Sequence, residues 1–322
     1  MPSISTCMIL KNEADTIYKT LESVSFSDEF IIGIDDKTTD DTYKEAMRFL
    51  RDRKHFLYYF KWEDDFSKAR NYGIDQASGE YILIMDGHET LVSHRIDKMN
   101  FKHDVYLFEI EIQQGHHRTM FQQARLFRNS YRYHNKSHNI LIYKAEDAAK
   151  ILGTVVLHKR SKKLQDARSK QRKEMNIPDL TNRVKTGDKR AMAQIAQEYY
   201  SYQDWDKAID AFKFYLGQEM MPSERYHTMM KLGMAYYYSN KFALAEKVWV
   251  ESEGHNADKR NAHYIFLGSL AKRFENNEEA LAWFDKALAI EKPQQFYFLF
   301  PDFYHEIPKR LKNDLSTRVV EG

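Results

Sequence analysis

The chain has 322 residues, of which 43% are hydrophobic and 30% are charged, and its net charge is +2. This length is enough for two domains with cores of their own, and the composition is ordinary for a globular protein. The small net charge excludes a global basic field for nucleic acid, although local patches stay open. The single cysteine, Cys7, excludes an internal disulfide framework and indicates a reducing compartment.

The amino terminus, MPSISTCMILKNEAD, has neither a basic n-region nor a long apolar core, so a signal peptide is not expected. No stretch approaches the roughly 20 apolar residues that a membrane-spanning helix needs. We therefore expect a cytoplasmic protein without a membrane span.

Short apolar runs alternate with amphipathic segments through the first part of the chain. Strands are expected at 3–10, 30–34, 55–60 and 81–85, with helices at 12–24, 39–50 and 67–77. This alternation is typical of a parallel sheet with right-handed crossovers. Further apolar runs at 105–112, 122–128 and 153–158 have no long helices between them, and they predict an antiparallel or mixed extension of the sheet.

Polar clusters follow two of the expected strands. Asp35 and Asp36 come after the second strand, and Asp86-Gly87-His88-Glu89 comes after the fourth. A polar turn is one interpretation of the second cluster, since Asp and Gly are common turn formers. Position favours a ligand site, because open α/β sheets bind ligands at the carboxyl ends of their strands. A carboxylate and an imidazole two residues apart can bind Mn²⁺, and the imidazole favours transition metals over Mg²⁺.

The segment 158–173, HKRSKKLQDARSKQRK, is strongly basic and polar. It predicts a solvated helix or a linker, and contact with nucleic acid is the alternative.

From about residue 188 the pattern becomes helical and repeats. Three segments, 199–212, 237–249 and 273–284, align on an alanine and on an aromatic residue four positions later: Ala208 and Phe212, Ala245 and Trp249, Ala280 and Phe284. The spacings of 37 and 35 residues lie near the ~34-residue period of tetratricopeptide helix pairs. Small alanines allow close helix contact and the aromatic residues fill the next gap, so core packing is favoured over ligand binding. The concave face of such repeats is a candidate docking surface.

Four segments of the first half resemble bacterial and phage family 2 glycosyltransferases that carry tetratricopeptide repeats behind a GT-A domain. They are ISTCMILKNEADTIYKTLESV, DEFIIGIDDKTTDDT, FKWEDDFSKARNYGIDQASGEYILIMDGHE and RLFRNSYRYHNKSHNIL. The resemblance covers roughly residues 3–158, and the repeats continue it. It implies an α/β GT-A domain, Rossmann-like with a mixed sheet, at 1–160. A basic linker or helix at 161–187 and an all-α domain of tetratricopeptide-like helical repeats at 188–322 would follow.

The resemblance also implies a UDP-linked nucleotide sugar as the donor. The residues expected to contact it are Asp35 or its neighbour Asp36, then Lys68, Arg70, Asn71 and Asp86. Asp35 matches the carboxylate that the family places against the nucleotide. The cations at the start of the helix after DDF would attract the diphosphate. The alternative is a surface helix whose Arg70 pairs with a nearby acid. Asp40 and Asp41 are instead assigned to a helix N-cap.

The fourth strand of the family ends in D-x-D-E, whose acids bind a divalent metal. Here the second aspartate is replaced by histidine, so the expected metal ligands are Asp86, His88 and His158. The metal would act as a Lewis acid on the departing diphosphate. A plain strand-end role is the alternative for His158.

The general base is unassigned. The family commonly reads H-E where this chain reads Lys136-Ser137-His138-Asn139. An inverting transferase needs a base within hydrogen-bond reach of the acceptor hydroxyl. The candidates are His138, Glu89, Glu109 and Glu111.

The expected function is a metal-dependent, hexosyltransferase-like glycosyltransferase that inverts the anomeric carbon and acts on a protein or polymeric acceptor recruited by the repeats. One alternative is a retired transferase domain that serves as a repeat-based adaptor. Another is a glycosyltransferase of modified nucleic-acid bases, which would use the basic run at 159–173.

Overall fold

The computed structural model describes residues 2–94, 96, 101–114, 117–158, 162–256, 259–293 and 298–320. The chain forms two compact units, Met1–Gln171 and Arg172–Gly322. Within the described ranges, no helix combines the length and the apolar character that crossing a membrane requires.

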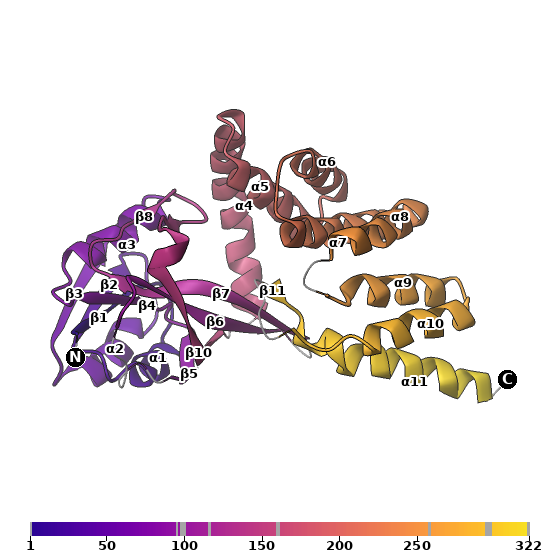
Figure 1. Ribbon diagram of the computed structural model, residues 1–322. Coiled ribbons are helices and arrows are strands. Elements are labelled where there is room, and N and C mark those ends of the chain that lie inside the picture. The colour runs from indigo at the N-terminus through magenta and orange to yellow at the C-terminus, as the bar shows by residue number, and fades with distance from the viewer. Residues whose placement is uncertain are drawn as a thin grey trace. The chain divides into compact units, whose positions relative to one another are not determined.

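The first unit is built on a mixed sheet with the strand order β3-β2-β1-β4-β7-β6-β10-β5 (Figure 1). Its strands are β1 (Ile4–Leu10), β2 (Glu29–Asp35), β3 (His55–Phe60), β4 (Tyr81–Ile84), β5 (Glu89–Ser93), β6 (Val105–Gln114), β7 (His117–Arg128) and β10 (Ala148–His158). The first four strands are parallel, whereas β7 runs antiparallel to both β4 and β6. The predicted parallel sheet with a mixed extension is therefore confirmed. Two short strands, β8 (Tyr133–His134) and β9 (Ile140–Leu141), pair with each other, and a 3₁₀ turn (Ala145–Asp147) precedes β10.

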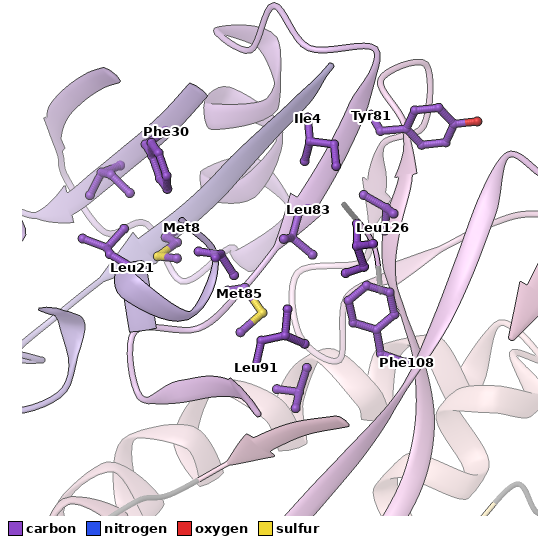
Figure 2. Close-up of a cluster of buried hydrophobic side chains, with 14 of the residues drawn as sticks. Ile4, Met8, Leu21, Phe30, Tyr81, Leu83, Met85, Leu91, Phe108 and Leu126 are labelled. Atoms are coloured by element: carbon purple, nitrogen blue, oxygen red, sulfur yellow. The ribbon is translucent and has the colours of Figure 1, made fainter. Parts of the chain in front are cut away.

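Helices cover both faces of the central strands. They are α1 (Ile17–Ser23), α2 (Thr42–Leu50) and α3 (Phe66–Asp75). Along β1, Met8 joins the apolar cluster that contains residues of α1 and α2, whereas Cys7 joins the cluster that contains Ile74 of α3. Figure 2 shows the first of these clusters between the sheet and its helices. Burial on both faces explains why these strands are nearly continuous apolar runs in the sequence.

Two local features differ from the sequence-based expectation. The first helix begins at Ile17 and not at Asn12, because Asn12 has a φ of +53° and the Glu13 N–H donates to Thr42 Oγ1. In addition, Glu89 begins the strand β5, which pairs antiparallel with β10 so that Glu89 lies opposite His158. The polar stretch after β4 is thus held between two strands.

The second unit is helical apart from the short β11 (Phe298–Leu299). Its helices are the part of α4 (Lys162–Lys185) from Arg172 on, then α5 (Lys189–Ser201), α6 (Trp205–Leu216), α7 (Pro222–Tyr238), α8 (Phe242–Ser252), α9 (Ala262–Arg273), α10 (Asn277–Leu288) and α11 (Glu306–Val320), with 3₁₀ turns at Glu253–His255 and Pro301–Tyr304. Consecutive helices pack as pairs, α5 with α6, α7 with α8 and α9 with α10 (Figure 1). The basic run continues into α4, and residues 159–161 lie outside the described residues.

The repeat alignment is confirmed at its predicted contacts. The three aligned alanines, Ala208, Ala245 and Ala280, are fully buried on the second helix of each pair, and the aromatic residues four positions later are buried beside them. Glycines on the first helices face two of these aromatic rings. A Cβ on Gly233 would lie 2.1 Å from Trp249 Nε1, and a Cβ on Gly268 would lie 2.5 Å from Phe284 Cε1. The unit is therefore a tetratricopeptide-like helical repeat in which a small residue meets a large ring in successive pairs.

Candidate functional site

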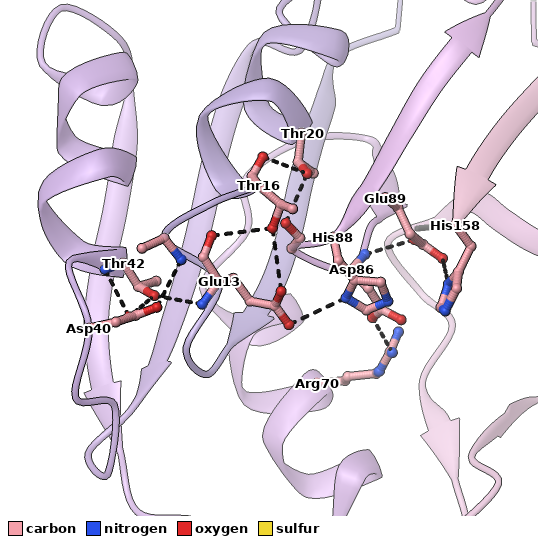
Figure 3. A network of polar contacts seen from close by, with 12 residues as sticks. Glu13, Thr16, Thr20, Asp40, Thr42, Arg70, Asp86, His88, Glu89 and His158 are labelled. Atoms are coloured by element: carbon pink, nitrogen blue, oxygen red, sulfur yellow. Dashed lines mark hydrogen bonds and ion pairs between the residues drawn. The ribbon is translucent and has the colours of Figure 1, made fainter. Parts of the chain in front are cut away.

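An arginine and an aspartate meet at the carboxyl end of β4. Arg70, on α3, donates from Nη2 to Asp86 Oδ1 at 2.9 Å, and its guanidinium carbon lies 5.3 Å from the centre of the Tyr133 ring. Burial alone would lower the pKa of Arg70, but the charge of Asp86 and the contact with Tyr133 raise it. The structure thus brings together the cation and the carboxylate that the sequence assigned to the donor site (Figure 3).

The first buried imidazole of the site is that of His88. Its Nδ1 lies 3.3 Å from Glu13 Oε1, and both residues are buried, with 4% and 8% of their surfaces exposed. Glu13 also accepts a hydrogen bond from Thr16 Oγ1 at 3.4 Å. Among the atoms that the structure describes, His88 Nε2 is buried and has no hydrogen-bond partner.

Glu89 is fully buried at the centre of a second group of contacts. Its Oε1 accepts from Arg125 Nη2 at 2.6 Å and faces His158 Nδ1 at 3.3 Å, while its Oε2 accepts from the Asp86 N–H at 2.8 Å. Burial alone would raise the pKa of Glu89, but the charge of Arg125 and these hydrogen bonds lower it. Glu89 is therefore an ionised carboxylate that joins β5, β7 and β10.

The two imidazoles lie edge to face. The His88 and His158 ring centres are 4.4 Å apart and their planes are nearly perpendicular, at 89°. A Cβ on Gly87, between Asp86 and His88, would lie 2.6 Å from Leu10 Cδ2 and 2.9 Å from Glu13 Cγ, so a larger residue would require these side chains to shift. Figure 3 shows Glu13 beside His88 and Glu89 beside His158.

The turn after β4 carries donor atoms for a divalent cation whose coordination a bound substrate would complete. In the described part of the chain, no group of three His, Cys, Asp or Glu side chains could by itself hold a metal ion. The buried Nε2 of His88 and the Asp86 carboxylate nevertheless lie on one short turn. Protein sites with one or two ligands commonly rely on substrate phosphates to complete the coordination of such a cation. The residues present fit a metal that arrives with a diphosphate.

Asp35 lies at the carboxyl end of β2, as predicted, and is buried. Its Oδ2 accepts from Lys11 Nζ at 2.9 Å and its Oδ1 accepts from the Lys37 N–H at 2.8 Å. Asp36 is exposed. Lys11 and Asp35 thus form an ion pair at the carboxyl end of β2.

Asp40 and Asp41, the two acids before α2, differ in their capping contacts. Asp41 occupies the N-cap position without a side-chain capping bond, whereas Asp40 accepts from the N–H groups of Thr42 and Ala14, each at 3.0 Å. Burial would raise the pKa of Asp40, but the hydrogen bonds from Thr42 and Ala14 lower it. The structural role predicted for this pair is therefore supplied by Asp40.

Two residues expected near the diphosphate make other contacts. Lys68 is exposed, and its Nζ pairs with Glu63 at 2.5 Å. Asn71 donates from Nδ2 to the Tyr133 carbonyl at 2.9 Å and accepts from the Tyr133 N–H at 2.8 Å. Asn71 thereby holds β8 against α3.

The remaining candidate bases lie on two other segments. Glu109 and Glu111 are half-buried on β6, where they pair with Val155 and Leu157 of β10. His138 is half-buried between β8 and β9 and has a φ of +45°.

Sequence reasoning missed two residues of the site, Glu13 and Arg125. Glu13 follows β1 at the same edge of the sheet as Asp35 and Asp86, so the strand-end rule could have found it. Arg125 is a charged residue inside the apolar run of β7, and a fully buried arginine requires an acidic partner.

The mixed sheet, its covering helices and the polar edge at the carboxyl ends of its first strands form an α/β domain. Residues 5–150 match the family model described as glycosyl transferase family 2.

Several known proteins are similar to parts of the chain. It is 36% identical to a TPR repeat-containing protein of Synechococcus elongatus over 92 residues, which are 29% of this chain and 22% of that protein. It is 38% identical to the SPbeta prophage-derived glycosyltransferase SunS of Bacillus subtilis over 85 residues, which are 26% of this chain and 20% of that protein. The crystal structure of S. aureus TarS residues 1–349 with UDP-GlcNAc aligns with a TM-score of 0.37 and 13% identity, covering 96% of this chain and 82% of that one. The chain thus spans only about a fifth of the length of the Synechococcus protein (22%) and of SunS (20%).

Proposed function

We propose that the protein is a metal-dependent glycosyltransferase that moves a sugar from a UDP-linked donor to a protein or polymeric acceptor, with inversion at the anomeric carbon. The observation that carries the proposal is the turn after β4. There Arg70 holds Asp86 at 2.9 Å, and the adjacent His88 presents a buried Nε2 without a partner among the described atoms. The match of residues 5–150 to the family 2 model supports the same chemistry.

Donor recognition is assigned to the carboxyl ends of β2 and β4. Asp35 would accept a hydrogen bond from the base or ribose, with Lys11 beside it at 2.9 Å to donate one, and Asp36 would reach the solvent side of the nucleotide. Arg70 would turn its charge toward the diphosphate, because a partly buried guanidinium is a strong partner for phosphate oxygens. Lys68 and Asn71 support this helix end from its surface and from β8.

Asp86, His88 and His158 would hold the divalent cation, together with donor phosphate oxygens. Such an ion supplies Lewis-acid stabilisation of the leaving diphosphate. Imidazole donors favour Mn²⁺ over Mg²⁺ at such a site.

In the transfer itself, the acceptor oxygen would form the new bond to the anomeric carbon while the bond to the diphosphate oxygen breaks and UDP leaves with the electron pair. The acceptor proton passes to a base, for which we keep His138, Glu109 and Glu111 as candidates. Glu89 is the weakest candidate, because its carboxylate already meets Arg125, the Asp86 N–H and His158. We assign it a supporting role.

The helical repeats would recruit the acceptor. Tetratricopeptide-like repeats form extended concave surfaces that bind partners, which fits a protein or polymer better than a small molecule.

The test is a panel of nucleotide sugars assayed for hydrolysis with Mn²⁺ and no added acceptor. Release of UDP from one donor, lost in excess chelator, is the expected result. Turnover of none of the donors would favour the adaptor function, and salt-sensitive binding to DNA would favour action on nucleic-acid bases.

A further inference from the structure

The two histidines of the candidate metal site share an arrangement that the Asp86-Gly87-His88 motif alone does not require. Each imidazole turns its Nδ1 toward a buried glutamate, His88 toward Glu13 and His158 toward Glu89, and both distances are 3.3 Å. The glutamates come from segments far apart in the sequence, one directly after β1 and the other at the start of β5.

An ionised carboxylate can only accept hydrogen bonds, so a neutral imidazole that faces one carries its proton on that nitrogen. The other ring nitrogen then has its lone pair available. For His88 that nitrogen is Nε2, which is buried and has no partner among the described atoms. A buried nitrogen lone pair without a donor is costly unless a ligand satisfies it.

The second glutamate is itself held in place. Arg125 donates to Glu89 at 2.6 Å and to the Ile84 carbonyl of β4 at 3.3 Å, so the carboxylate is fixed to the strand that leads into Asp86. Glu13 is positioned by its N–H, which donates to Thr42 Oγ1 at 2.8 Å. Glu89 thus belongs to the sheet itself, whereas Glu13 is anchored through its backbone to the start of α2.

We propose that Glu13 is a positioning residue that holds His88 as its Nδ1–H tautomer, so that the buried Nε2 of His88 is presented to a borderline transition metal, and that Glu89 orients His158 beside it through Nδ1. Metal-ligating histidines almost always donate their other N–H to such a carboxylate or carbonyl, and removing that partner typically weakens metal binding 10- to 100-fold. The inference rests on the proposed function for the presence of a metal, and it extends the site to Glu13, a residue outside the motif.

The first measurement reads the tautomer directly. Long-range ¹H–¹⁵N spectra of the ¹⁵N-labelled full chain distinguish Nδ1–H from Nε2–H imidazoles, and loss of one spin system in His88→Gln assigns His88. We expect the Nδ1–H form of His88 in the wild type. Glu13→Gln should retain this form, because its amide oxygen can still accept the hydrogen bond from Nδ1, and Glu13→Met should lose it. An Nε2–H form of His88 in the wild type would overturn the proposal.

The second measurement uses Co²⁺ as the probe, titrated alone and with UDP, and reads visible absorption. In whichever titration the wild type binds Co²⁺, with or without UDP, Glu13→Met should bind it 10- to 100-fold more weakly. Glu13→Gln should have a Co²⁺ affinity between those of the wild type and Glu13→Met. Glu29→Gln is the matched control, because Glu29 is also a buried, hydrogen-bonded glutamate of the sheet but lies at the start of β2. It should bind Co²⁺ like the wild type, and thermal melting checks that each variant is folded.

Unchanged Co²⁺ affinity in a folded Glu13→Met, or no wild-type binding in either arm, would refute the positioning role. These readouts need no sugar and no turnover. A protein that binds Co²⁺ as expected but cleaves no nucleotide sugar would contradict the proposed transfer and leave the positioning role standing.

Discussion

At the scale of single residues, the histidine at position 88, where the family that this chain resembles has the second aspartate of D-x-D-E, has a structural explanation. His88 is buried between Glu13 and His158, with a ring-to-ring distance of 4.4 Å to the latter. An aspartate at this position would lie beside Glu13 and add a second buried negative charge, whose cost the imidazole avoids.

This leads to a prediction about metal preference. His88→Asp should keep donor hydrolysis but shift the preferred ion from Mn²⁺ toward Mg²⁺, because a carboxylate is the harder ligand. His88→Ala should be milder than loss of Asp86, since water can take one coordination position. The measurement is the rate of UDP release at matched Mn²⁺ and Mg²⁺ concentrations, and an unchanged Mn²⁺ to Mg²⁺ ratio in His88→Asp would count against His88 as a ligand.

Glu29 gives a prediction about acid stability. Burial alone would raise the pKa of Glu29, but hydrogen bonds from Ser5, Ser78 and Lys54 lower it from 4.5 to about 2. Because the folded-state pKa is the lower one, the stabilisation is fully present above pH 4.5 and is lost as the pH falls toward about 2. The loss is at most about 3 kcal/mol.

The check is urea unfolding of the wild type and Glu29→Gln at several values between pH 5 and pH 3, where the wild type should lose stability more steeply. Equal slopes for the two proteins would show that Glu29 does not contribute.

The residue scale also shows where sequence reasoning reaches its limit. The strand-end positions of Asp35 and Asp86 and the place of Arg70 on a helix could be predicted from the hydrophobic pattern, and the roles of these residues stay predictions. Lys68 and Asn71 share a motif with Arg70, but the sequence does not tell which side of α3 each one occupies, and the structure places them against Glu63 and Tyr133. Glu13 and Arg125 become recognisable only when their long-range partners are known.

At the scale of elements, the repeats depend on one kind of contact, a small residue on the first helix against a ring on the second. Gly233→Ala should destabilise the protein even though alanine favours a helix by up to ~1 kcal/mol, because the new Cβ would lie 2.1 Å from Trp249 Nε1. Overpacking of this kind costs about 1–3 kcal/mol.

The matched control is Gly254→Ala, since a Cβ at Gly254 meets nothing within 4 Å. Thermal melting of the two variants decides the matter, and equal melting temperatures would contradict the packing account.

Most elements could be predicted from periodicity, and the exceptions have physical causes. The β-strands at 55–60 and 81–84 lie where their apolar runs are. The strand β5 was not predicted because Glu89 is charged, and only its pairing with β10 and with Arg125 makes that charge tolerable inside a sheet. The late start of α1 reflects the left-handed Asn12, which also has no signature in the hydrophobic pattern.

At the scale of the whole molecule, the chain divides into the units Met1–Gln171 and Arg172–Gly322, and the proposed function divides with them. Donor chemistry is assigned to the first unit and acceptor recruitment to the second.

A core substitution in the second unit should therefore separate the two activities. Ala245→Phe should lower the stability of that unit by about 1–3 kcal/mol, because Ala245 is fully buried. UDP release without acceptor should stay at the wild-type rate at temperatures where the variant is folded. A parallel fall in acceptor-free hydrolysis would show that the repeats also serve the donor site.

In the proposed function, the turn after β4 binds the metal and the diphosphate of a nucleotide sugar. The most direct measurement is UDP release from the donor panel by the wild type and Asp86→Ala, with Mn²⁺ and with excess chelator, beside thermal melts of both proteins. We predict that chelator stops the wild type, and that Asp86→Ala melts like the wild type but is slower by about a thousandfold, since loss of this charge removes several kcal/mol of leaving-group stabilisation. Wild-type turnover in Asp86→Ala, or full turnover in excess chelator, would contradict the account.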